Sequence, residues 1–221
     1  MLISGKAEYV PWMPDRDFLD KEGEKIEQIP SPKVILTHYS IHALPKDVFK
    51  KRVKIVHVYR NPKSVAVSLY HHMKAERLLG DKFPETFPEF LPLFLDEKNH
   101  MMGYWFSYIP EVEKFCRDNP DYPIINIKYE EVKKNQRTEI KRLAQFLEIE
   151  VSDSFADEII SRCEISKLKI VRGDEKDGGR PAMYRKGLVS DWKNWFTVAD
   201  NEAFDKVLEE KMACSSLTFE Y

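Results

Sequence analysis

The stretch from Arg60 to Ser68 has the residue types and the spacing to bind an oxyanion. Arg60 follows an apolar run, Asn61 suits the N-cap of a helix, and Pro62 suits the first helical position. The unpaired amides and positive dipole end of such a helix would face the same place as the Arg60 guanidinium. Ser68 comes close to two turns after Asn61, so its hydroxyl would lie on the same face. We predict a phosphate site; the alternative is an Arg60 that pairs with a surface carboxylate.

Alternating strands and helices would position this stretch. Apolar runs predict buried parallel strands at 33–37, 53–59 and 122–128. The patterns predict helices at 62–79, 104–117, 139–148, 154–163 and 200–212, and at 83–95 a loop that carries a partly apolar helix and suits a substrate lid. Residues 5–32 read as loop with a short helix at 15–23, and 173–180 as a mobile loop. This order predicts one α/β domain over residues 1–221, with three α/β/α layers and a central parallel sheet.

Polar side chains follow all three predicted strands. His38 comes after the first strand, Arg60 after the second, and Tyr129 after the third. Ligands of open α/β sheets bind at the carboxyl ends of the strands, so we expect these three residues to surround the site.

The composition bears on the partners and the cellular compartment of the protein. The 35 basic and 37 acidic residues give a formal charge of -2, which does not predict a nucleic-acid partner. Cys116, Cys163 and Cys214 are too few and too far apart for a disulfide framework or a zinc site, and they suit a reducing compartment. No apolar run is long enough to span a bilayer and no secretory leader precedes the first element. We therefore expect a cytoplasmic protein with neither a membrane nor a metal as partner.

A second motif near the C-terminus identifies a family. Residues 184–197 read YRKGLVSDWKNWFT. Together with the Arg60 to Ser68 stretch, this segment resembles the cytosolic sulfotransferase family, whose signature is R-K-G-x-x-G-D-W-K-N-x-F-T. Ser190 replaces the second glycine. The resemblance extends from about Pro30 to Phe219. It implies a P-loop-NTPase-like fold and transfer of a sulfuryl group from 3′-phosphoadenosine 5′-phosphosulfate to a hydroxyl or amine of a small acceptor, such as a phenol, an alcohol or a steroid.

The resemblance implies that His38 is the general base. A neutral imidazole within hydrogen-bond reach of an acceptor hydroxyl can take its proton near pH 7. The alternative is a histidine that caps a strand end. Leu36 stands where the family has a lysine that holds the sulfuryl oxygens, and leucine has no donor for them.

The resemblance also implies residues that bind the donor nucleotide. Arg60 and Ser68 match the family residues at the 3′-phosphate. Arg185, Lys186 and Gly187 match the loop that closes over the same phosphate, where glycine lets the backbone approach closely; an ordinary basic loop is the alternative.

At the adenine, Tyr129 matches a tyrosine that contacts the base, although a packed core tyrosine is the alternative. Cys163 and Ile165 stand near a family threonine and an adenine-stacking aromatic, and both substitutions predict a weaker grip on the base.

Two features concern assembly and completeness. The spacing of Lys193, Thr197, Val198 and Glu202 fits the family's dimerisation motif, which predicts a weak homodimer; in the alternative interpretation, Thr197 only caps the last helix. The family's T-Y-P-K-S-G-T-T-W loop, which wraps the 5′-phosphosulfate and supplies a catalytic lysine, has no counterpart here. The sequence therefore predicts an N-terminally incomplete domain, and it leaves open a non-catalytic protein that binds nucleotide or regulates.

Overall fold

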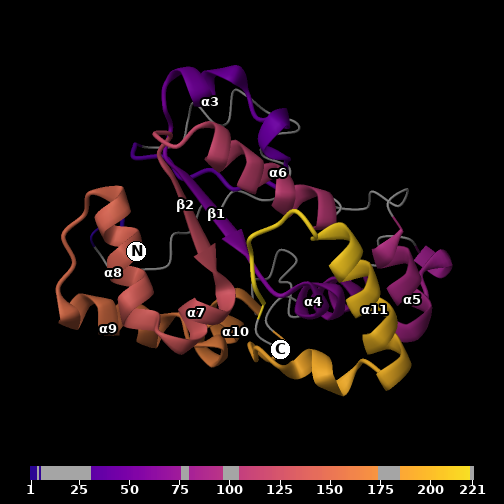
Figure 1. The fold of residues 1–221 in the computed structure, drawn as a ribbon. Coiled ribbons are helices and arrows are strands. Elements are labelled where there is room, and N and C mark those ends of the chain that lie inside the picture. Colours follow the sequence, from indigo (N-terminus) through magenta and orange to yellow (C-terminus); the bar gives the residue numbers. More distant parts are fainter. Residues whose placement is uncertain (4, 6–30, 76–79, 97–104, 174–184, 220–221) are drawn as a thin grey trace.

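The computed structural model describes residues 1–3, 5, 31–75, 80–96, 105–173 and 185–219. In this part of the chain, β1 (Ile55–Tyr59) and β2 (Ile124–Lys128) form a parallel sheet with helices to either side of it (Figure 1). Ile55 lies opposite Ile124, and Tyr59 lies opposite Lys128. Because the strands are parallel and in this register, their carboxyl ends meet at one edge of the sheet.

Helices make up most of the remaining described chain. They are α3 (Lys46–Lys50), α4 (Pro62–Ala75), α5 (Phe87–Leu95), α6 (Trp105–Asp118), α7 (Tyr129–Lys134), α8 (Gln136–Leu147), α9 (Asp153–Arg162), α10 (Ile165–Gly173) and α11 (Val198–Lys211), with 3-10 turns η1 (Ile41–Ala43), η2 (Gly80–Lys82) and η4 (Asp191–Asn194). The five predicted helices and the helix within 83–95 are confirmed, with ends displaced by a few residues. The expected short helix at 15–23 lies outside the described residues. So does the expected loop at 173–180, except for Gly173, which ends α10.

The two faces of the sheet are covered unequally. On one face, His57 is buried against α6, with its ring 5.4 Å from that of Tyr108. On the other face, Ile125 and Ile127 of β2 are buried, and α8 packs beside β2. Val56 and Val58 point the same way from β1, yet they are 40% and 60% exposed. The described elements therefore cover this face at β2 and leave it open at β1.

The predicted strand at 33–37 is wrong. Residues 33–40 have no regular secondary structure, and Val34, Ile35 and Leu36 are 40–47% exposed. An apolar run forms a buried strand only where a neighbouring strand accepts its hydrogen bonds and a layer covers its side chains. Among the described residues, β1 pairs only with β2, so neither condition is met.

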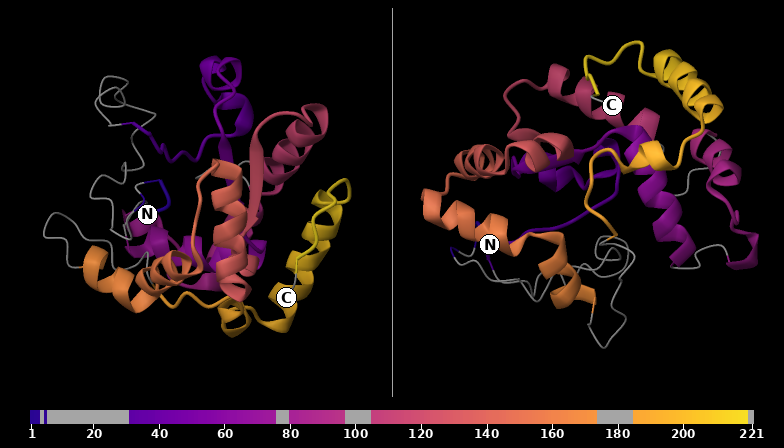
Figure 2. Two further views of the ribbon diagram at one scale, coloured as in Figure 1. Left: turned by 90° about the vertical axis from the view of Figure 1, so that its left-hand side faces the viewer. Right: turned by 90° about the horizontal axis from the view of Figure 1, so that it is seen from below.

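The main core lies beside the sheet, between α4, α5, α6 and α11 (Figures 1 and 2). Its buried members are Ala66, Val67, Tyr70, Met73, Phe87, Phe90, Leu91, Trp105, Phe106, Ile109, Trp192 and Phe204. Lys63 extends into this region with a 2% exposed side chain, and its Nζ contacts Asp205 at 2.5 Å and Asn201 at 2.6 Å. The first turn of α4 is thereby tied to α11. A buried ammonium is tolerated because it is paired and hydrogen-bonded.

Candidate functional site

The corner between β1 and α4 has the geometry expected of a helix start. The Asn61 side-chain oxygen accepts hydrogen bonds from the backbone N–H of Lys63 at 2.9 Å and of Ser64 at 3.3 Å, and Pro62 is the first residue of α4. Both predicted roles are confirmed. The backbone N–H of Asn61 donates to Oε1 of Glu130 at 2.9 Å, so buried Glu130 on α7 joins the end of β2 to the corner.

Arg60 lies at this corner between two segments that are distant in the sequence. Its guanidinium is 4.3 Å from the centroid of the Tyr129 ring, and its Nη2 donates to the carbonyl of Leu188 at 3.0 Å. Burial lowers the pKa of Arg60, opposed by Tyr129 and Glu130, and the group stays a cation. Its Nε is buried and has no hydrogen-bond partner among the described residues. Since unpaired buried donors are costly, this N–H is suited to a ligand oxygen.

The segment from Arg185 to Val189 lies against the same corner. Oγ of Ser64 donates to the carbonyl of Val189 at 2.9 Å. Ser68 follows Ser64 by one turn of α4, so its exposed hydroxyl lies on the face that meets this segment. The structure therefore brings Arg60, the Ser68 face of α4 and the basic segment together.

Gly187 occupies a backbone conformation that other residues adopt at a cost. Its φ is +69°, and a Cβ at this position would lie 2.9 Å from Cδ1 of Ile165. The torsion angle favours glycine, and a Cβ here would also require the end of the Ile165 side chain to shift. Ile165 of α10 thus lies against the basic segment, and the predicted close approach of the Gly187 backbone to a phosphate stays a prediction.

Asp191 forms ion pairs with both cations of this segment. Its side chain is 3% exposed; Nη2 of Arg185 lies 2.5 Å from one carboxylate oxygen and Nζ of Lys186 lies 2.8 Å from the other. Asn194 Nδ2 and Trp195 Nε1 also donate, at 3.1 and 3.3 Å. Burial alone would raise the pKa of Asp191, but the hydrogen bonds from Lys186, Arg185 and Asn194 outweigh it and hold the pKa well below its usual range.

His38 and Cys163 are placed differently from the corner residues. His38 is an exposed residue of the irregular segment 33–40. The expected meeting of three strand ends holds for Arg60 and Tyr129, but it fails for His38 because no strand precedes it. Cys163 ends α9 as its C-cap and is an exposed free thiol. Tyr129 begins α7 directly after β2, and its ring contacts Arg60.

The segment that fits a dimerisation motif lies on the surface at the start of α11. Thr197 is the N-cap of α11: its Oγ1 accepts from the backbone N–H of Asp200, and Asp200 accepts from the backbone N–H of Thr197. The capping role is confirmed. Lys193, Val198 and Glu202 are exposed, and Val198 is 77% exposed.

Sequence reasoning missed Ser64, Glu130 and Asp191. Ser64 comes three residues after the N-cap and Asp191 belongs to the quoted motif, so both positions carried a signal. Glu130 carried none, because its partner Asn61 is 69 residues away.

The described ranges contain neither a candidate metal centre nor a candidate membrane span. In these ranges, no three His, Cys, Asp or Glu side chains are grouped so that they could hold a metal ion. No described helix combines the length and the apolar character needed to cross a bilayer.

A cavity of about 720 Å³ lies at the α8–α9 end of the molecule, lined by Leu2, Val151 and Phe155 among others. Its lining includes no residue of the corner.

The comparisons of this chain with known proteins agree on one family. The family model described as "Sulfotransferase domain" matches residues 2–216. The chain is similar to Sulfotransferase 1B1 of Canis lupus familiaris (32% identity over 204 residues, 89% of this chain and 67% of that protein) and to Sulfotransferase 1C2 of Homo sapiens (32%, with the same two coverages). It therefore spans about two thirds of the length of these curated relatives.

Among solved structures, the chain is similar to mouse sulfotransferase SULT7A1 complexed with PAP, with 33% identity and a TM-score of 0.75 over 87% of this chain and 69% of that one. It also resembles retinol dehydratase in complex with androsterone and inactive cofactor PAP, with a TM-score of 0.72 over 88% of this chain and 58% of that one. The identity to retinol dehydratase is 21%, so this likeness concerns the fold alone.

Proposed function

The chain belongs to the sulfotransferase domain family, and from this premise we propose that the β1–α4 corner binds the 3′-phosphate of 3′-phosphoadenosine 5′-phosphosulfate. The sulfuryl group of this donor passes to a hydroxyl or amine of a small acceptor such as a phenol, an alcohol or a steroid. The nucleotide 3′-phosphoadenosine 5′-phosphate (PAP) is released. The donor is a co-substrate, and the proposal includes no metal.

The observation that supports the proposal most is the buried Nε of Arg60, which has no partner among the described residues. Beside it lie the N-terminus of α4, the Ser68 face and the basic pair Arg185 and Lys186. A phosphate would receive charge-assisted hydrogen bonds from the guanidinium, and the helix dipole would favour its negative charge. Gly187 lets the basic segment approach, and Tyr129 and Cys163 remain candidates for the adenine side.

For the chemical step, we propose that His38 accepts the proton of the acceptor hydroxyl. The acceptor oxygen then bonds to sulfur while the bond from sulfur to the bridging phosphate oxygen breaks. Because His38 lies on an exposed irregular segment, this role requires that the segment be ordered over the donor when the acceptor binds. We also propose a cytoplasmic location, and a weak homodimer through the exposed Lys193, Thr197, Val198 and Glu202.

A second candidate function is nucleotide binding without catalysis. It is favoured by Leu36, which replaces a donor for the sulfuryl oxygens, and by the exposure of the segment that carries His38. This candidate retains the phosphate corner and leaves out the proton transfer.

Two measurements on the full chain test both candidates. The first is calorimetric titration with PAP, and the second is donor-dependent sulfation of a panel of phenols, alcohols and steroids. Binding together with turnover supports the enzyme. Binding without turnover supports the second candidate, and the absence of PAP binding contradicts both.

A further inference from the structure

Asp191 is the point on which the basic segment converges. Two neighbouring cations contact its two carboxylate oxygens, with Arg185 at 2.5 Å and Lys186 at 2.8 Å. The carboxylate is 3% exposed. Asn194 donates to the oxygen that Lys186 contacts, and Trp195 donates to the oxygen that Arg185 contacts. Asp191 is thus held in one place by neutral donors and holds two charged side chains in turn.

Consecutive cations without such an anchor would repel each other and retain the rotamer freedom of long side chains. Arg185 and Lys186 each have several donors, and their contacts with Asp191 use one nitrogen of each. Within the described residues, the remaining N–H donors are available to an oxyanion. The guanidinium of Arg60 donates to the carbonyl of Leu188, two residues after Lys186, so Arg60 and the ordered pair belong to the same corner.

We propose that Asp191 is a positioning residue for phosphate recognition: it orders Arg185 and Lys186 before the nucleotide arrives. This inference rests on the proposed 3′-phosphate site and adds a residue that does not itself touch the ligand. The conformational entropy of these two long side chains is then lost when the chain folds. Because nucleotide binding does not have to order them, binding is stronger.

A carboxylate beside an anion site also repels the anion through its charge, and this repulsion weakens binding. If Asp191 acted only through its charge, its neutralisation would raise the local positive potential and tighten PAP binding. If it acts by positioning, neutralisation releases the two cations and weakens PAP binding. The substitution Asp191→Asn keeps the shape of the side chain and separates these two effects by the direction of the change.

The experiment compares wild type and Asp191→Asn by calorimetric titration with PAP and with adenosine 5′-phosphate, which lacks the 3′-phosphate. We expect about ten- to hundredfold weaker binding of PAP, the loss of one to two charge-assisted hydrogen bonds, and little change for adenosine 5′-phosphate. The matched control is Asp157→Asn, which removes a surface carboxylate paired with Arg137 at 2.6 Å between α8 and α9. This control should leave PAP affinity unchanged.

A second readout does not depend on nucleotide. Side-chain NMR relaxation of the Arg185 Nε–H, assigned with Arg185→Lys, should show an ordered guanidinium in unliganded wild type and a mobile one in Asp191→Asn. Tighter or unchanged PAP binding in the variant, or equal Arg185 mobility in both proteins, overturns the inference. A wild type that does not bind PAP contradicts the proposed function, and the NMR comparison then decides the inference by itself.

Because Asp191 is buried, its variant can fail to fold. Asn194→Ala then decides the question, since Asn194 is exposed and its amide donates to Asp191 at 3.1 Å. Loosening of the carboxylate should weaken PAP binding about twofold to fivefold, because one of the hydrogen bonds that hold it is lost, and should raise the mobility of Arg185. If PAP affinity and Arg185 mobility both stay at wild-type values, the inference is overturned.

Discussion

The β1–α4 corner and segment 33–40 contain residues assigned to one reaction, but they are built in different ways. At the corner, Asn61, Ser64, Glu130 and Asp191 are all at most 5% exposed, and hydrogen bonds connect them to three separate parts of the chain. In segment 33–40, apolar side chains such as Leu36, at 45% exposure, face solvent beside His38. The corner is therefore organised by the described chain itself. The position of His38 depends on whatever covers its segment.

This difference implies that binding and turnover can be separated. In the proposed site, nucleotide binding would use groups that are already ordered, so it would need little further organisation. Proton transfer requires the imidazole within hydrogen-bond reach of the acceptor, and an exposed irregular segment does not secure that distance. The following substitutions test the separation, beginning with the largest expected effect.

We expect His38→Ala to lower donor-dependent sulfation by about a hundredfold to ten-thousandfold, the usual contribution of a general base. PAP affinity should stay within twofold of wild type, roughly the scatter of a surface substitution. His42→Ala, an exposed histidine four residues later, is the matched control. Equal loss of turnover and of PAP affinity in His38→Ala would show that the two regions are not separable.

At the corner, Arg60→Met should show the reverse pattern. The methionine keeps an apolar stem beside Tyr129 and removes the guanidinium, so calorimetry should record about ten- to hundredfold weaker PAP binding. Arg137→Ala removes an exposed arginine elsewhere and should have no effect on PAP. A wild-type affinity in Arg60→Met would exclude the corner as the phosphate site.

The substitution Gly187→Ala tests how closely the basic segment must approach α10. The left-handed torsion costs about 1–2 kcal/mol for any L-residue, and the new Cβ would also meet Ile165 at 2.9 Å. Gly80→Ala is the control, because its φ is +55° and nothing lies within 4 Å. Chemical denaturation should show a larger loss of stability at Gly187, together with weaker PAP binding.

Adding Ile165→Val to Gly187→Ala removes the Cδ1 atom in question. The extra loss of stability should then shrink toward that of Gly80→Ala. No change in the double variant would show that the contact with Ile165 is not the cause.

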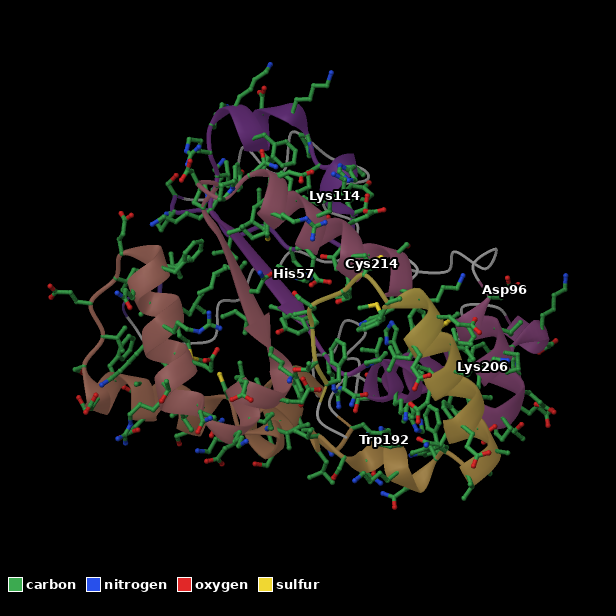
Figure 3. All side chains as sticks on the ribbon, viewed as in Figure 1. His57, Asp96, Lys114, Trp192, Lys206 and Cys214 are labelled. Carbon is green, nitrogen blue, oxygen red and sulfur yellow. The ribbon has the colours of Figure 1, made fainter. Side chains whose placement is uncertain are left out.

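The smallest effect, on stability, is expected at His57. In contrast to the exposed His38, this histidine is buried, and it lies away from the corner. Figure 3 shows His57 on β1, apart from Trp192 beside the basic segment. Burial lowers the pKa of His57 below 6.5, opposed by the hydrogen bond with Asn126 at 2.7 Å. As the pH falls below 6.5, the unfolded chain gains a proton at this group before the folded chain does, so stability falls. Above 6.5 this contribution is constant.

Denaturant titrations of wild type and His57→Gln over this pH range measure that effect. The variant has no titrating group at this position, so its stability should decrease less steeply below pH 6.5. Parallel pH profiles of stability for the two proteins would contradict a lowered pKa of His57. Nucleotide affinity should not follow the state of His57.

Local patterns predicted the corner well. An apolar run, an asparagine and a proline are enough to end β1 and begin α4, since caps and first-turn preferences act within a few residues. The same holds for Thr197, which caps the start of α11. The run at 33–37 was misjudged for the opposite reason: its apolar pattern was correct for a strand, but pairing depends on a neighbour that the run does not contain.

The sequence by itself determined the family, the residue types proposed to bind phosphate and the helix that presents them. Only the tertiary structure decided that Glu130 holds Asn61 from 69 residues away, that Ser64 holds Val189 from 125 residues away, and that Asp191 joins the two cations. It also decided that His38 lies outside regular structure. Periodicity and capping are properties of neighbouring residues, whereas buried hydrogen bonds between distant segments exist only once the strand ends and helices have packed together.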